Sequence, residues 1–270
     1  MSEFVRATLL LYRQALQATG SSLIRNWVLI AAVIALAIFM FLITSVARSL
    51  GMLGGFLLGA ANAFAVGALL GLLEQAVMST RRMTWEDLWQ AAGQYFWDVL
   101  TIGFIVLLPL QFLELGMQAN PYGPMIVSAI FFLVFLLLNP VPEIIYQSRL
   151  GAPLDSLKES YEFVLENWIE WFLPLAIVLA PFGLSFFFGI SSQGGRLSGL
   201  DFLQLLQLPF AVLSQLFQFF GFSSSLATVM VLILTPVGVV MMMLFRGFLF
   251  KALHGSSRRQ RQFQARSLGS

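Results

Sequence analysis

The sequence predicts an all-α integral membrane protein with six transmembrane helices arranged as three parallel repeats. Two observations on composition support this fold class, because 59% of the 270 residues are hydrophobic and only 10% are charged. A soluble domain is typically about 25% charged. So few charges cannot cover the surface of a protein, and most of this surface must therefore face lipid. The third observation is that a more polar helical segment precedes every second apolar stretch.

Six stretches of the chain carry the roughly 20 apolar residues that a transmembrane helix needs. They are Trp27–Val46, Met52–Val77, Val99–Leu115, Met125–Tyr146, Trp171–Ile190 and Leu226–Phe250. Because the number of spans is even, the sequence predicts that both termini lie on the same side of the membrane.

The distribution of basic residues predicts which side that is. All but two of the 15 Lys and Arg residues fall on the side of the termini, and only Arg48 and Arg196 fall on the other. Cytoplasmic loops carry an excess of Lys and Arg, so we expect both termini to be cytoplasmic. The tryptophans also lie at the predicted inner ends, where indole rings favour the headgroup level. These are Trp27, Trp85, Trp89, Trp97, Trp168 and Trp171.

Three segments at the predicted inner side combine charged residues with an apolar stripe. Apolar spacings of three and four indicate one face of a helix. The segments are too charged to cross the membrane, and we expect amphipathic helices in the cytoplasmic interface. The stripes are Val5, Leu9, Tyr12, Leu16 and Leu23; Leu88, Ala91, Ala92, Tyr95 and Phe96; and Leu154, Leu157, Tyr161, Val164 and Leu165.

Two Asn-Trp pairs, in "SLIRNW" and "FVLENW", stand 141 positions apart and each leads into an apolar run. They predict a repeat of interfacial helix, span, outer loop and span, with units at about 1–82, 83–150 and 151–254. All units point the same way, as in a parallel repeat. The alternative is that any interfacial helix before a span looks similar. Aligned positions are Leu16, Leu88 and Leu157; Asn26, Asp98 and Asn167; Glu74 and Glu143; and Ser79 and Ser148.

Residues 1–254 are thus predicted to form a single transmembrane domain, followed by a disordered basic tail over 255–270. Four arginines of this tail contribute about 1 kcal/mol each beside an anionic leaflet. The basic tail and the belt of tryptophans predict contact with the anionic inner leaflet. The segment Ser191–Ser225 is expected to form one or two amphipathic helices on the outer leaflet.

Small residues recur at every fourth position of the second predicted span. Such a ridge lets helix backbones approach closely in lipid. The ridge predicts tight helix packing, either within the chain or against another copy. Its members are Gly51, Gly55, Gly59, Ala63, Gly67 and Gly71.

Ionisable residues within spans are candidates for function. Glu74 and its repeat equivalent Glu143 lie near the inner ends, at a depth comparable to that of Arg246. If the repeats pack about a common axis, these charges form a buried polar cluster with Glu–Arg pairing, completed by Gln75, Asn139 and Tyr146. The alternative is that each side chain reaches the nearby interface on its own.

The sequence offers little chemistry for catalysis. It contains no Cys and a single His, His254, so it lacks the spacing of a metal site or a Ser–His pair. The glycines of the second span have period four and do not form a nucleotide-binding loop. We therefore expect no enzymatic activity, no metal, no cofactor and no nucleic-acid partner.

The layout of a polar-aromatic helix before each hairpin, as in "WEDLWQAAGQYFWDVL" and "DSLKESYEFVLENW", resembles a loose group of uncharacterised prokaryotic multi-pass proteins. It is similar to the membrane domain fused to some glycerophosphodiester phosphodiesterases. The resemblance lies in this layout rather than in a motif, and no catalytic residue carries over. It implies a multi-pass protein of the cell inner (plasma) membrane with a lipid-associated or unknown role.

Two functions follow as hypotheses. The first is a non-catalytic membrane protein that organises lipid or assists a protein partner, with a homo-oligomer as another possible state. The second is a small transporter or permease subunit with a polar pocket near the cytoplasmic ends of the spans. Transporter sites usually lie near the midplane, which is almost wholly apolar in this sequence.

Overall fold

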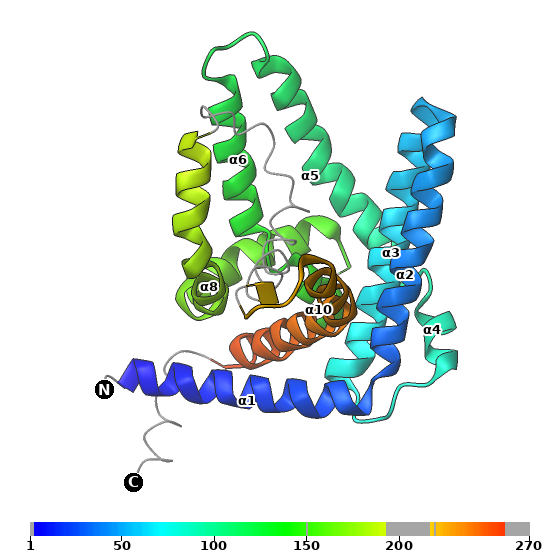
Figure 1. Cartoon of the computed structure of the whole chain (residues 1–270), viewed down its shortest axis with the longest axis vertical. Coiled ribbons are helices and arrows are strands. Elements are labelled where there is room, and N and C mark those ends of the chain that lie inside the picture. Colours follow the sequence, from blue (N-terminus) through cyan, green and yellow to red (C-terminus); the bar gives the residue numbers. More distant parts are fainter. Residues whose placement is uncertain (1–2, 150, 193–216, 219, 257–270) are drawn as a thin grey trace. The chain divides into compact units, whose positions relative to one another are not determined.

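The structure is a computed structural model that describes residues 3–149, 151–192, 217–218 and 220–256, with the side chains of 3, 4 and 178–192 left outside the description. The described residues form helices and turns without a β-strand (Figure 1). The helices are α1 (Glu3–Arg25), α2 (Val28–Ala47), η1 (Arg48–Leu50), α3 (Met52–Met78), α4 (Trp85–Ala91), α5 (Phe96–Met117), α6 (Gly123–Leu137), α7 (Val141–Gln147), α8 (Pro153–Ser192) and α10 (Ser224–His254).

Among the described residues, five helical segments are long and apolar enough to cross a membrane. They are Val28–Leu50, Met52–Met78, Phe96–Met117, Gly123–Gln147 and Ser224–His254. Five of the six predicted spans are therefore confirmed as apolar helices, which indicates a multi-pass membrane protein. The sixth, Trp171–Ile190, falls in helix α8, and most of its side chains lie outside the description.

The chain divides into two compact units. Unit 1 comprises residues 1–104, 140–167 and 236–270, and unit 2 comprises residues 105–139 and 168–235. Unit 1 thus contains α1 to α4 together with the beginning of α5, all of α7, the beginning of α8 and the end of α10. The unit therefore combines the predicted inner segments of all three repeats with the first two spans, α2 and α3.

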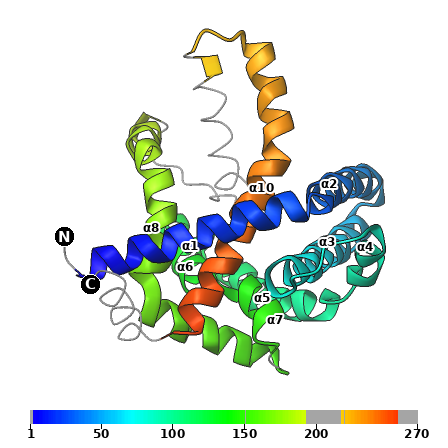
Figure 2. The same ribbon diagram turned by 90° about the horizontal axis from the view of Figure 1, so that it is seen from below.

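Within unit 1, α2 and α3 run side by side, and α1 runs across their direction (Figures 1 and 2). A close turn joins α2 to α3. A Cβ atom added to Gly54 would lie 2.0 Å from the carbonyl oxygen of Ala47, so only glycine fits at this position. Gly51, at the start of α3, has a φ of +56°, which also favours glycine.

The predicted ridge of small residues packs along only part of α3. Cβ atoms added at Gly67 and Gly71 would lie 2.8 Å from Phe96 N and Gln94 Oε1, respectively. Gly55 and Gly59 have no neighbouring atom within 4 Å of the added Cβ. The C-terminal half of the ridge therefore admits the segment between α4 and α5 of the same chain.

At the end of each predicted interfacial helix the helical conformation is interrupted, although the chain continues. The break between α1 and α2 falls at Asn26 and Trp27, and the break inside α8 falls at Asn167, which has φ −124° and ψ 17°. The helical stripe predicted over Leu88–Phe96 is interrupted, because α4 ends at Ala91. Ala92 is already extended, with ψ 115°, and Gly93 has a φ of +81° in the turn that follows, which favours glycine.

Unit 2 is held by a tight turn and a polar contact. A Cβ atom added to Gly123 would lie 2.0 Å from the carbonyl oxygen of Met117, which fixes glycine between α5 and α6. The indole Nε1 of Trp171 in α8 donates a hydrogen bond of 2.9 Å to Asn139 Oδ1. Many apolar side chains of this unit are exposed, as expected for helices in lipid; examples are Leu107, Phe112, Phe132, Leu133 and Leu232.

Two predictions lie largely outside the described residues. The amphipathic helices expected over Ser191–Ser225 and the disordered tail expected over 255–270 fall mainly on residues that the structure does not describe.

Candidate functional site

The first segments of α1 and α8 show the same pattern of burial at an offset of 141 positions. Asn26 and Asn167 are both buried, as are the small residues Thr19 and Ser160. The following tryptophans are both exposed, with 57% exposure for Trp27 and 58% for its partner in the pattern, Trp168. Both helices thus bury small polar residues and expose several apolar side chains, next to exposed charged residues such as Arg13 and Glu162. Other outward members are Val5, Leu9, Leu16, Ile24, Leu154, Tyr161 and Leu165.

The end of α1 is attached to the end of α3 by polar contacts. Ser22 Oγ donates to the carbonyl of Ala76 at 3.0 Å, and Asn26 Oδ1 accepts from the backbone N–H of Met83 at 3.1 Å. Asn26 Nδ2 also donates to Ser22 Oγ. The buried asparagine therefore satisfies backbone groups at the helix corner, which is a structural role.

Glu143 of α7 and Arg246 of α10 form a bidentate ion pair. Arg246 Nε donates to one carboxylate oxygen at 2.8 Å, and a second guanidinium nitrogen donates to the other at 2.9 Å. The Glu143 side chain is only 6% exposed and that of Arg246 is 28% exposed. Two parallel charge-assisted hydrogen bonds are the strongest arrangement available to this pair of side chains.

The buried pair lies beside a junction of three helices. A Cβ atom added to Gly247 of α10 would lie 2.5 Å from the Tyr146 hydroxyl of α7 and 2.9 Å from Val77 Cγ2 of α3. Gln147 Nε2 donates to the Gly247 carbonyl at 2.9 Å, and Lys251 Nζ donates to the Val77 carbonyl at 3.3 Å. The missing side chain at Gly247 allows these three helix ends to meet.

Glu74 of α3 has a different arginine as its partner. Arg149, at the end of α7, forms an ion pair with Glu74 Oε1. The other carboxylate oxygen accepts from Tyr95 Oη at 2.7 Å and from Gln94 Nε2 at 2.9 Å. Three donors thus bind one carboxylate, which we call the Glu74 cluster. The Arg149 side chain is 65% exposed, in contrast to that of Arg246.

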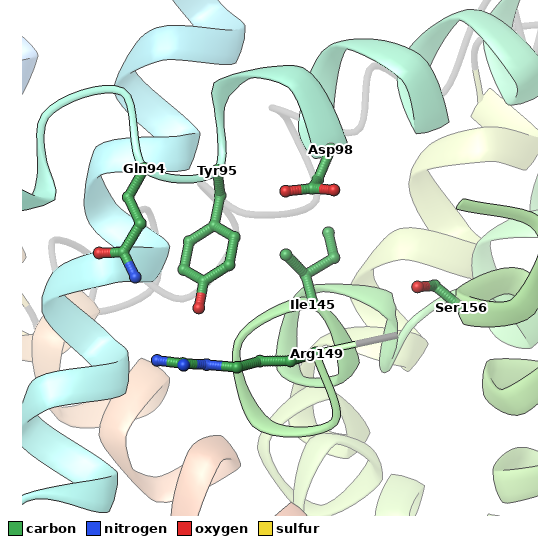
Figure 3. A pocket seen from close by; sticks show the side chains of 6 residues that line it. All are labelled: Gln94, Tyr95, Asp98, Ile145, Arg149 and Ser156. Atoms are coloured by element: carbon green, nitrogen blue, oxygen red, sulfur yellow. The ribbon is translucent and has the colours of Figure 1, made fainter. Parts of the chain in front are cut away.

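A cavity of about 280 Å³ lies next to the Glu74 cluster (Figure 3). In this view Gln94 and Tyr95 lie above Arg149 at one side, Asp98 stands above Ile145 in the middle, and Ser156 lies at the other side. All six lining residues belong to unit 1. They are Gln94, Tyr95, Asp98, Ile145, Arg149 and Ser156.

The surroundings of Tyr95 and Asp87 shift their ionisation in opposite directions. Burial, together with the hydrogen bond to the Glu74 carboxylate, raises the pKa of Tyr95 to about 12, so its hydroxyl stays a donor at neutral pH. At the start of α4, burial disfavours the Asp87 carboxylate, but hydrogen bonds from Thr84 and the charge of Arg81 outweigh it. The pKa of Asp87 therefore lies below its ordinary value.

The residues of the predicted polar cluster are divided among several places. Glu143 contacts Arg246 and lies near the buried Tyr146, whereas Glu74 contacts Arg149. Asn139 belongs to unit 2. Gln75 is half-buried and has no side-chain hydrogen bond within the described part of the chain.

Sequence reasoning missed Arg149, Tyr95 and Gln94 as partners of Glu74. Arg149 was informative in the sequence only as a basic residue of an inner loop, and Tyr95 only as a member of an apolar stripe. Arg149 has a positive φ of 48°, and this conformation contributes to the position of its side chain. A positive φ is uncommon for an arginine, so the sequence does not predict it. The glycine at position 93, which follows α4, was the available signal for a turn that brings Gln94 and Tyr95 to α3.

The described residues contain no group of three His, Asp or Glu side chains that is able to hold a metal ion. The chain matches no family model, no curated protein and no solved structure. The resemblance to the membrane domain of glycerophosphodiester phosphodiesterases stays a prediction.

Proposed function

We propose that this chain is a non-catalytic protein of the inner membrane that organises lipid at the cytoplasmic interface, alone or for a protein partner. The observation that carries the proposal is the matched outward faces of α1 and the first part of α8. Both expose apolar side chains and a tryptophan and bury small polar residues. Such a face suits the boundary between headgroups and acyl chains, where amphipathic helices and indole rings are most stable.

The crossing of α1 over the directions of α2 and α3 supports this orientation (Figure 2). If α2 and α3 span the bilayer, a helix that runs across them lies along the membrane surface. Basic residues near the same helix ends, including Arg25, Arg81 and Lys251, favour an anionic leaflet there. By the positive-inside rule, we propose that this is the cytoplasmic leaflet.

The proposal includes three parallel repeats with six spans. Support comes from the shared burial pattern at an offset of 141 positions and from the partners of the two glutamates. Glu74 of the first proposed repeat binds Arg149 of the second, and Glu143 of the second binds Arg246 of the third. Each acidic residue thus links its repeat to the next one. The meeting of Val77, Tyr146 and Gly247 fits the same succession.

The absence of native cysteine allows a direct test of the proposed topology. Thr80→Cys follows α3, and Ala119→Cys lies between α5 and α6. In cells with a permeabilised outer membrane, we expect a membrane-impermeant maleimide to label Ala119→Cys at once and Thr80→Cys only after the inner membrane is opened. Labelling of both positions before opening would contradict the proposed orientation.

The proposed role itself is tested by the thermal stability of the purified full chain across a panel of lipids and water-soluble metabolites. We expect lipids to raise the melting temperature and metabolites to leave it unchanged. Single-Trp variants that retain Trp27 or Trp168 should also be quenched by lipids brominated near the headgroup. Absence of quenching in both variants would overturn the interfacial arrangement.

A transporter or permease subunit is the second candidate, and the cavity beside the Glu74 cluster is the observation that favours it. A soluble metabolite that stabilises the wild type, but not Glu74→Gln, would support this candidate instead. Flux of that metabolite into liposomes containing the protein would then be the decisive measurement.

A further inference from the structure

We propose that the cavity beside the Glu74 cluster binds a zwitterionic headgroup that carries an ammonium and a phosphodiester, as in phosphatidylethanolamine. This inference deepens the proposed function and rests on it, because it names the lipid that the interfacial region recognises. The site comprises Arg149, Asp98 and Ser156, with Gln94 and Tyr95 at the edge.

The cavity carries charges of both signs. Arg149 contributes a guanidinium that is 65% exposed, and its contact with Glu74 occupies only part of its five N–H donors. Asp98 contributes a carboxylate in the first turn of α5 and stands above Ile145 in Figure 3. A ligand that satisfies both residues must itself carry both an anionic and a cationic group.

Two of the lining side chains have no partner within the part of the chain that the structure describes. Ser156 is 4% exposed and lines the cavity, and its hydroxyl makes no hydrogen bond to another described residue. The carboxylate of Asp98, which is half-buried, has neither an ion pair nor a hydrogen bond among these residues. Both groups line the cavity and are therefore available to a ligand or to water there.

The arrangement selects among headgroups by charge and by hydrogen bonding. A purely anionic headgroup would face the carboxylates of Asp98 and Glu74, and a purely cationic ligand would face Arg149. A primary ammonium donates charge-assisted hydrogen bonds to Asp98, whereas the trimethylated ammonium of phosphatidylcholine has no donor. The phosphodiester accepts from the free N–H groups of Arg149 and from the Ser156 hydroxyl.

The location explains why the source should be a lipid. The cavity lies where α3 and α7 end and where α5 and α8 begin. In the proposed topology this is the headgroup level, and the exposed Trp97 stands next to Asp98 in sequence. A volume of about 280 Å³ suits a headgroup, since pockets for whole drug-sized ligands span roughly 300–1,000 Å³.

The test uses the full chain in nanodiscs of phosphatidylglycerol with increasing phosphatidylethanolamine or phosphatidylcholine, read out as melting temperature and as lipid retained in native mass spectrometry. We expect phosphatidylethanolamine alone to be retained and to raise the melting temperature. Asp98→Asn and Arg149→Gln should each weaken apparent binding by about tenfold, the loss expected for one charge-assisted hydrogen bond. Ser156→Ala should weaken it less.

Glu86→Gln and Arg82→Gln are matched controls, because both side chains are exposed and neither lines the cavity. They should retain phosphatidylethanolamine as the wild type does. Each variant must also melt cooperatively in phosphatidylglycerol alone, which separates lost binding from lost folding. If Asp98→Asn does not fold, Asp98→Glu is measured in its place. This variant keeps the carboxylate and should therefore retain phosphatidylethanolamine.

Three results would overturn the inference. The first is equal retention of phosphatidylethanolamine and phosphatidylcholine, and the second is unchanged retention in both Asp98→Asn and Arg149→Gln. The third is stronger stabilisation by free glycerophosphoethanolamine or an amino acid than by the lipid, which would assign the cavity to a soluble zwitterion. The proposed function is tested by a different experiment: it is wrong if neither Trp27 nor Trp168 is quenched by lipids brominated near the headgroup.

Discussion

The two arginine–glutamate pairs of unit 1 combine the same side chains in different surroundings. In the pair of Glu143 and Arg246, both side chains are largely enclosed and share two parallel hydrogen bonds. In the pair of Glu74 and Arg149, the carboxylate is mostly enclosed but the arginine is largely exposed. Tyr95 and Gln94 supply further donors to that carboxylate.

From this difference we infer that one pair is needed for helix packing, whereas the arginine of the other pair is available to contact a ligand. A buried charge that loses its partner is left uncompensated, so the pair of Glu143 and Arg246 must stay intact for α7 and α10 to pack. Exposed pairs contribute little to stability because water and salt screen them. Arg149 is therefore the arginine that is available to a ligand.

The largest effect is expected when the buried pair is broken. Glu143→Gln leaves the Arg246 guanidinium without its carboxylate, and we expect a loss of about 3–5 kcal/mol in the free energy of unfolding. Denaturation of the purified protein in detergent measures the loss. Adding Arg246→Met should recover much of it, because the uncompensated charge is removed. A loss below that of Glu86→Gln, an exposed control, would mean that the pair is not enclosed in solution.

A smaller effect is expected at the helix junction beside that pair. The methyl group of Gly247→Ala would contact the Tyr146 hydroxyl and Val77, and such overpacking costs about 1–3 kcal/mol. Tyr146→Phe removes the hydroxyl, so the double variant should lose less stability than the sum of the single losses. Gly59→Ala is a control, because a Cβ atom added there has no neighbouring atom within 4 Å. Additive losses in a double-mutant cycle would show that Gly247 and Tyr146 do not touch.

The cluster at Glu74 should respond to pH through Tyr95. Tyr95→Phe removes one hydrogen bond to a carboxylate, and we expect a loss of about 1–2 kcal/mol at neutral pH. A pKa raised to about 12 favours the neutral phenol in the folded protein. The stability that Tyr95 contributes is therefore complete below pH 10 and is lost as the pH rises through 12. Tyr95→Phe should lack this loss, and the late rise in tyrosinate absorbance should be smaller by one tyrosine in this variant than in the wild type.

Much of the fold was predictable from the sequence because apolar length and helical spacing are local properties. The spans at Trp27–Val46 and Met52–Val77 agree with α2 and α3 to within about a residue, since each apolar run is bounded by polar residues or glycine. The break at Gly93 was not predicted. A stripe with the spacing of a helix continued through it, but the extended Ala92 and the positive φ of Gly93 form a turn there instead.

The partners of the charged residues depend on contacts between distant segments and were predictable only in part. The depth of Glu143 and Arg246 along their spans suggested a pair, because two opposite charges at one level of a bilayer favour each other. The same argument placed Glu74 with Arg246, but Glu74 binds Arg149. Arg149 follows the end of α7, and a count of residues from the membrane boundary does not show that its long side chain reaches back to α3.

The smallest loss of stability is expected from the exposed pair. Arg149→Gln removes the cation from Glu74, but Tyr95 and Gln94 still donate to that carboxylate. We expect a change of about 0–1 kcal/mol in the free energy of unfolding, measured by denaturation in detergent. The change should shrink further at 1 M salt, where the Debye length falls to about 3 Å, whereas the loss in Glu143→Gln should persist.

Arg149→Gln could instead lose as much stability as Glu143→Gln, with equally little dependence on salt. That result would contradict the difference proposed between the two pairs. Arg149 would then be a structural residue like Arg246, enclosed by lipid or by another part of the protein. A small and salt-sensitive loss leaves the guanidinium accessible at the cavity. Because stability then changes little, any drop in lipid retention by the same variant reports on the contact of Arg149 with the headgroup rather than on unfolding.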